Sequence, residues 1–137
     1  SLMAVATAHK IQQISTASDP KKGIMDAIGD LSGVEVFFDL VLLGTYIKGN
    51  KIGNVWIPDQ TVGEDEFQSK CGLVLKKGPN AFKDDEYTQY DGQDIAVGDW
   101  VVFFVGDAKA ITINGTPCRL LKANQIRMRI KDPTRIF

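Results

Sequence analysis

The sequence has little of what most catalytic and metal sites are built from. Its 137 residues include one histidine, His9, and two cysteines, Cys71 and Cys118. A single histidine near the start of the chain allows no Ser-His-Asp or Cys-His set and no zinc site made of cysteine and histidine. Phosphate-binding glycine loops are also missing. We therefore expect no enzyme, no metal site and no cofactor.

Long apolar runs and a charge surplus are missing too. The longest apolar stretch, 34–43, is interrupted by Glu35 and Asp39, and it is shorter than the roughly 18 residues of a membrane span. The net charge is -1, which argues against a general nucleic-acid binder. No basic and then apolar leader is visible. We expect a cytoplasmic protein with no membrane or nucleic-acid partner, whose cysteines are buried thiols.

The first 33 residues differ in composition from the rest. Residues 1–18 are small and polar, and we predict a loosely ordered arm. Asp19 and Pro20 are typical of a helix start. An apolar stripe follows at helical spacing: Ile24, Ile28 and Leu31. We predict a short amphipathic helix from Pro20 to Leu31, and a division into an N-terminal segment, 1–33, and one domain, 34–137.

The rest of the chain is rich in strand signals. Short β-branched and aromatic runs are separated by Gly, Pro, Asn and Asp, and they predict strands at 34–47, 71–78, 99–106, 110–115, 117–123 and 125–131. Turns are indicated at 97–99, where Asp99 is expected to cap its own backbone, and at 114–116. This spacing is typical of a β-barrel or sandwich.

Two acidic clusters, EDE at 64–66 and DDE at 84–86, are the remaining candidates for acid–base or cation chemistry. Paired carboxylates can serve either purpose. Neither cluster has the alternating spacing and glycine of an EF-hand, and we predict that both are solvated loop segments.

The last predicted strand carries a cationic stripe. Strand alternation puts Ile126, Met128 and Ile130 on one face. Arg127, Arg129 and Lys131 then fall on the other face. Such a stripe could contact phosphates or an acidic patch on another subunit. The simplest interpretation is the solvated face of an edge strand, charged to discourage unwanted pairing.

An apolar triplet, Val55-Trp56-Ile57, stands between polar loop sequence and Pro58. Proline ends regular strand pairing. From the residues alone two interpretations stay open: the triplet starts a core strand, or it is an exposed anchor for a partner.

Motifs in a fixed order between residues 39 and 132 resemble the GroES-type co-chaperonins. DLVLL at 39–43 is similar to the first strand of that family, and GNVWIP at 53–58 is similar to the end of its mobile loop. The later motifs follow in family order: GLVLKKG at 72–78, VGDWVVF at 97–103, INGTPCRLL at 113–121 and NQI at 124–126.

The resemblance implies a partly open β-barrel, here with a short N-terminal helix, in a seven-membered ring whose subunits bind a GroEL-type chaperonin and assist protein folding. It implies these chaperonin-contacting residues: Gly53, Asn54, Val55, Trp56, Ile57 and Pro58. It also implies that the stretches 37–43 and 126–130 pair between neighbouring subunits. The interface residues would be Phe37, Leu40, Leu42, Ile126, Met128 and Ile130.

The chain departs from the family pattern at Leu40, where arginine is usual, at Asn54, where a second glycine is usual, and at Trp56, where an aliphatic residue is usual. A helix-bearing N-terminal extension is more typical of phage or prophage relatives. The alternative hypothesis is therefore a phage or prophage structural or assembly protein that reuses this fold, with its loop on another phage protein.

Overall fold

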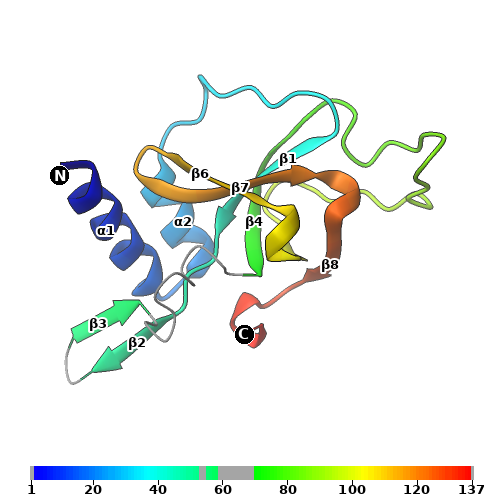
Figure 1. The fold of residues 1–137 in the computed structure, drawn as a ribbon. Helices are drawn as coiled ribbons and strands as arrows, with labels where there is room; N and C mark the ends of the chain where they lie inside the picture. Colours follow the sequence, from blue (N-terminus) through cyan, green and yellow to red (C-terminus); the bar gives the residue numbers. More distant parts are fainter. Residues whose placement is uncertain (1, 53–54, 59–69, 137) are drawn as a thin grey trace.

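The computed structural model of the chain describes residues 2–52, 55–58 and 70–136 (Figure 1). Two helices come first: α1 (Leu2–Ser15) and α2 (Pro20–Ile28). The strands follow: β1 (Leu40–Thr45), β2 (Gly49–Ile52), β3 (Val55–Pro58), β4 (Cys71–Lys77), β5 (Trp100–Phe103), β6 (Lys109–Ile113), β7 (Thr116–Lys122) and β8 (Ile126–Ile130). Short 3-10 helices lie at Val105–Asp107, Ala123–Gln125 and Pro133–Arg135. The chain is mainly β, as the sequence predicts.

Helix α2 begins where the sequence predicts. The Asp19 carboxylate accepts hydrogen bonds from two backbone N–H groups of the first turn, and Pro20 is the first helical residue. The helix ends at Ile28, earlier than the predicted Leu31, because Gly29 takes a φ of 70°. That left-handed conformation suits glycine and stops the helix.

The prediction of a loosely ordered arm over residues 1–18 is wrong, because this segment forms α1. Ile11 and Ile14 of α1 are 5% and 3% exposed, so the helix is held by burial of its apolar side. The two helices approach closely: a Cβ added to Gly23 would lie 3.6 Å from the carbonyl oxygen of Ile14 in α1. The stabilisation of α1 comes from tertiary packing, which cannot be read from a short stretch of sequence.

Six strands form one antiparallel sheet in the order β6-β7-β1-β4-β5-β8. The sheet is open, with β6 and β8 at its two ends. β1 lies between β7 and β4, so both of its edges are hydrogen-bonded within the chain. Strands β2 and β3 form a separate two-stranded sheet.

The turn between β6 and β7 is the predicted hairpin turn. Asn114 and Gly115 have φ of 51° and 74°, the left-handed pair that a two-residue hairpin turn requires. The Asn114 side chain also donates a hydrogen bond of 2.8 Å to the carbonyl of Ile28. The hairpin is thereby tied to the end of α2.

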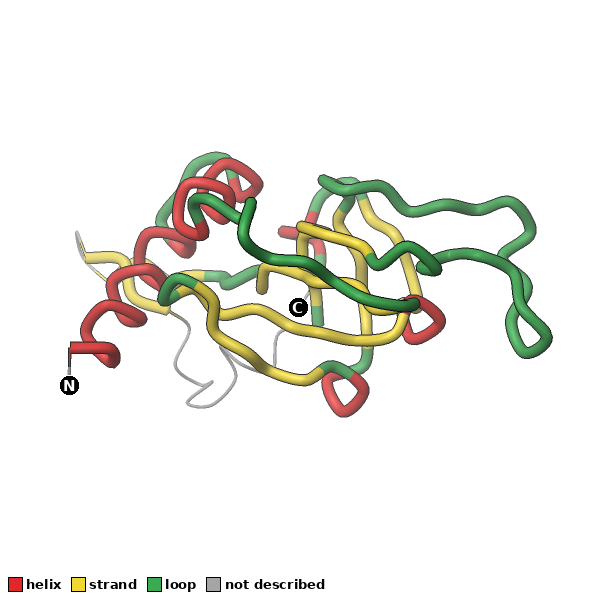
Figure 2. Tube along the Cα trace, turned by 90° about the horizontal axis from the view of Figure 1, so that it is seen from above, coloured by secondary structure: helices red, strands yellow, loops and turns green. Residues whose placement is uncertain are grey.

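The main sheet buries apolar side chains on both faces. The face that receives the helices carries the helix-side cluster, whose buried members include Ile11, Ile14, Ile24, Ala27, Ile28, Leu42, Leu73 and Trp100. The opposite face carries the loop-side cluster, which includes Val41, Leu43, Val74, Ala81, Phe82, Val101, Phe103 and Leu121. Figure 2 shows the helices at one end of the sheet and the long loop 79–95 at the other.

Both cysteines are buried thiols, as predicted, and each is 1% exposed. Burial raises the pKa of Cys71 and the pKa of Cys118 to about 12, from an ordinary value of 9.0. The thiolate is the reactive form. We expect native protein at about pH 8 to resist thiol-labelling reagents and urea-unfolded protein to react at both cysteines.

The same pKa shift predicts a pH dependence of stability. Unfolded thiols ionise near the ordinary pKa of 9.0, whereas the folded thiols hold their protons to about 12. Their contribution to stability is complete below the lower value and is lost as the pH rises through this window. Labelling with a chromogenic disulfide at about pH 8 checks the first point, and urea unfolding at several pH values up to and into this window checks the second. Rapid stoichiometric labelling of the native protein at about pH 8 would contradict them.

Candidate functional site

The predicted contact triplet lies in the β2–β3 hairpin. The hairpin register pairs Asn50 with Ile57 and Lys51 with Trp56. The hairpin is inserted between β1 and β4, which are direct neighbours in the main sheet, and their pairing reaches Thr45 and Gly72. The chain therefore leaves the sheet at the end of β1, forms the hairpin, and returns to the adjacent strand (Figure 1).

The triplet is a strand, but it is not a strand of the main sheet. Val55, Trp56, Ile57 and Pro58 make up β3, which pairs with β2 alone. The backbone of the triplet is therefore extended, and the choice between a core strand and an exposed anchor stays a prediction. Gly53 and Asn54, the other predicted contact residues, lie outside the described residues.

Helix α1 lies beside β3. The two elements are in contact, and α1 also contacts α2 and β7. In Figure 1 the hairpin stands next to the end of α1. The N-terminal segment therefore forms part of the surroundings of the predicted contact strand.

The first half of the predicted subunit interface needs correction. Phe37 precedes β1 and is 56% exposed, Leu40 begins β1, and Leu42 is 1% exposed in the helix-side cluster. Because β1 is hydrogen-bonded to β7 and β4, residues 40–43 have no free edge to pair with a neighbouring subunit. The strand pairing of these residues is internal to this chain, and Phe37 lies before the paired strand.

The second half of the predicted subunit interface lies on β8, which is the last strand at one end of the main sheet. A register shift in the β5–β8 ladder pairs Phe103 with Ile126 but Val102 with Met128. Ile126 therefore packs with the loop-side cluster, whereas Ile130 packs with the helix-side cluster. The predicted common face for the three apolar residues is wrong, because a bulge reverses the alternation. Met128 is 45% exposed.

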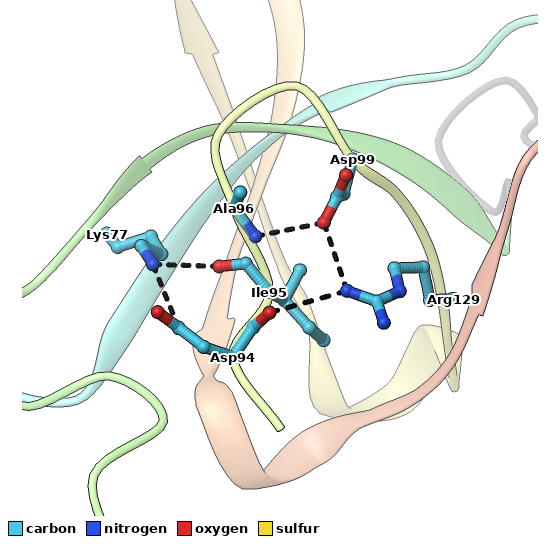
Figure 3. Close-up of polar contacts among 6 residues, drawn as sticks. All are labelled: Lys77, Asp94, Ile95, Ala96, Asp99 and Arg129. Carbon is cyan, nitrogen blue, oxygen red and sulfur yellow. Dashed lines mark hydrogen bonds and ion pairs between the residues drawn. The ribbon is translucent and has the colours of Figure 1, made fainter. Parts of the chain in front are cut away.

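The turn before β5 holds a network of charged groups (Figure 3). The Asp99 carboxylate accepts a hydrogen bond of 2.9 Å from the backbone N–H of Ala96, and one of 3.3 Å from Nη1 of Arg129. This confirms Asp99 as a residue that caps its own turn. Gly98 has a φ of 97°, which the turn requires.

A second part of the network ties the turn to β4. Nζ of Lys77 donates to Oδ1 of Asp94 at 3.1 Å and to the carbonyl of Ile95 at 2.8 Å. Nη1 of Arg129 donates to the carbonyl of Asp94 at 3.3 Å. Cationic side chains from β4 and β8 thus fix the segment 94–99 from two sides.

The carboxylates of the acidic cluster at 84–86 accept hydrogen bonds from the backbone of their own loop. Oδ1 of Asp85 accepts hydrogen bonds from the backbone N–H groups of Tyr87, at 2.7 Å, and Thr88, at 2.8 Å. Asp84 likewise accepts from a backbone N–H group, so these carboxylates shape their own exposed loop. The cluster at 64–66 lies outside the described residues. Among the residues that the structure describes, no group of three His, Cys, Asp or Glu side chains is arranged to hold a metal ion.

One neighbour of the charged turn is not predicted by the sequence. Nζ of Lys21, in the first turn of α2, would lie 3.8 Å from a Cβ added to Gly98. The two residues are far apart in the chain, and no motif links them. Only the docking of α2 on the sheet brings this lysine to the turn.

The chain matches no protein-family model and no curated protein. Over the described ranges, no helix combines the length and the apolar character that a membrane crossing needs. A function must therefore be inferred from the hairpin, the sheet edges and the charged turn.

Proposed function

We propose that the chain is a co-chaperonin-like subunit, which binds a GroEL-type chaperonin through the β2–β3 hairpin and assists protein folding. The observation that carries this proposal is the position of β3, an apolar strand in a separate two-stranded sheet, inserted between the neighbouring strands β1 and β4. An apolar element held outside the main sheet suits recognition by a groove on another protein.

The expected energetics fit a reversible contact. Burying Val55, Trp56 and Ile57 on a partner contributes several kcal/mol, at roughly 25 cal/mol per Å². Ordering of the interface opposes this gain, and strand pairing within the hairpin reduces that cost. The resulting affinity suits a partner that must be released in every cycle. In this proposal the chaperonin hydrolyses ATP, and the chain itself needs no cofactor and catalyses no reaction.

The proposal includes a ring of identical subunits, seven by resemblance to the family, assembled in the cytoplasm. The two ends of the main sheet, β8 and β6, are the strands available for pairing, because β1 is internal. A contact between β8 of one subunit and β6 of the next is heterologous, and such a contact closes into a ring when the rotation per subunit fits.

The contact between α1 and β3 favours a second candidate function. A partner that approaches the hairpin meets the N-terminal helix at the same place. A phage or prophage structural or assembly protein with this fold would use helix and hairpin together on another phage protein. The chain would then be a stoichiometric component of purified particles.

ATP-dependent association with a GroEL-type chaperonin tests the proposal. We expect the wild type to bind, and Trp56→Ala and Ile57→Ser each to weaken binding by at least about tenfold. Loss of a buried apolar anchor at an interface typically costs about 2 kcal/mol or more. Sedimentation or light scattering of the mixture, with and without ATP, measures the association.

Tyr87→Ala is the matched control, because Tyr87 is an aromatic residue that is 87% exposed in the loop 79–95. Its replacement should leave chaperonin binding unchanged. No association of the wild type in the presence of ATP would refute the co-chaperonin proposal. Recovery of the chain in purified virus particles, together with that result, would establish the second candidate.

A further inference from the structure

A hollow lies where the start of α2, the turn at 97–99 and the end of β8 meet. Its volume is about 480 Å³, within the range of small-molecule sites. The residues that line it are Lys21, Gly98, Asp99, Trp100, Arg129, Ile130 and Lys131. Three separate parts of the chain therefore contribute to one concave surface.

The lining has an excess of positive charge. Lys21, Arg129 and Lys131 are cationic, and Asp99 is the carboxylate among the lining residues. Asp99 is already engaged by Arg129 and by a backbone N–H group. In the described part of the chain, neither Lys21 nor Lys131 forms an ion pair with a carboxylate. Within the described residues, these two ammonium groups at the hollow are therefore not neutralised by a carboxylate.

We propose that this hollow binds a small ligand with a phosphate group. A phosphate carries up to two negative charges, which match the net charge of the lining side chains. Nη1 of Arg129 already donates to Asp94 and Asp99, so the donors that its guanidinium can offer to phosphate oxygens are Nη2 and Nε. The two lysines add ammonium donors. Trp100 and Ile130 supply an apolar wall beside the charged groups. None of the lining residues belongs to the proposed chaperonin contact, so the two proposals are tested separately.

The binding affinity should respond in opposite directions to the loss of a cation and to the loss of the carboxylate. Lys21→Ala and Lys131→Ala each remove a cation, and we expect each to weaken binding by about fivefold, the upper range for one exposed charge pair. Asp99→Asn removes the carboxylate but keeps an oxygen that can accept from Ala96. We expect this variant to bind more tightly than the wild type.

Titration calorimetry with pyrophosphate as the probe, at a fixed ionic strength of about 0.1 M, tests the proposal on the full chain. Lys22→Ala is the matched control, because Lys22 is the next residue in α2, forms an ion pair of 3.1 Å with Asp26, and does not line the hollow. We expect saturable binding that Lys22→Ala leaves intact. The affinity should be highest for Asp99→Asn, lower for the wild type and lowest for Lys21→Ala.

Three results would overturn it. One is the absence of saturation up to about 10 mM pyrophosphate, a limit weaker than the millimolar affinity of an ordinary weak site. Another is an equal loss of binding in Lys22→Ala and Lys21→Ala, which would indicate attraction to the overall surface charge. The third is weaker binding by Asp99→Asn in a variant whose unfolding midpoint is unchanged.

Discussion

Replacing Gly78 with alanine is expected to lower the free energy of unfolding by about 3 kcal/mol, the upper part of the usual range for overpacking. A Cβ at Gly78 would lie 2.6 Å from the carbonyl oxygen of Phe37 and would also collide with that of Phe38. Both obstacles are backbone atoms, which cannot swing away as side chains do. The N–H of Gly78 also donates 2.8 Å to the carbonyl of Leu40, so the segment cannot retreat without losing this bond.

Urea unfolding of the wild type and the variant measures this effect. Gly106→Ala is the matched control, since a Cβ at Gly106 would meet no atom within 4 Å and the residue has no left-handed backbone. There the reduced freedom of the unfolded chain should make the protein more stable by about 0.4–1 kcal/mol. Similar losses in both variants would contradict the proposed collision.

Replacing Ile24 with alanine is the second large effect, with an expected loss of about 3–4 kcal/mol of unfolding free energy. Ile24 is 0% exposed and belongs to the helix-side cluster. Its Cγ2 fills the space above Gly44, where a Cβ would lie only 2.6 Å away. Truncation removes the contact by which α2 sits on β1 and leaves a cavity that the sheet cannot close.

The adjacent residue provides the control. Met25 lies on the same helix and is 47% exposed, so Met25→Ala should change stability by less than about 1 kcal/mol. The same urea experiment applies, with the slope of unfolding free energy against urea compared between variants. If Met25→Ala proves as costly as Ile24→Ala, the burial of α2 on the sheet is not what stabilises it.

Local signals in the sequence are strong enough to predict much of this fold. Asp19 and Pro20 mark the start of α2, and the left-handed Asn114 and Gly115 form the expected hairpin turn. The strand-rich segments after residue 33 likewise become strands, though with shorter bounds. In each case the information lies within a few consecutive residues.

Features that depend on distant partners could not be predicted in the same way. Ile11 and Ile14, on the apolar side of α1, are buried in the same cluster as residues of α2. The internal position of β1 follows from its pairing with β7, which is distant in sequence. The bulge that separates Ile126 from Ile130 depends on the register with β5.

The candidate sites show the same limit. The order of motifs indicates Val55–Pro58 as a contact segment, but only the structure assigns this strand to its own two-stranded sheet. Arg129 and Lys131 were visible as a cationic stripe, and Asp99 as a turn residue. Their meeting with Lys21 depends on how α2 docks, which no local pattern encodes.

The pairing of Thr45 with Gly72 has a consequence for how this protein can change. The main sheet is continuous across the base of the hairpin. The register of β1 with β4 therefore does not depend on the length or composition of the insertion. Doubling the length of such an insertion costs only about 0.6 kcal/mol in closure entropy. If the β2–β3 hairpin is the recognition element proposed above, its sequence can change to suit another partner while the register of β1 and β4 stays the same.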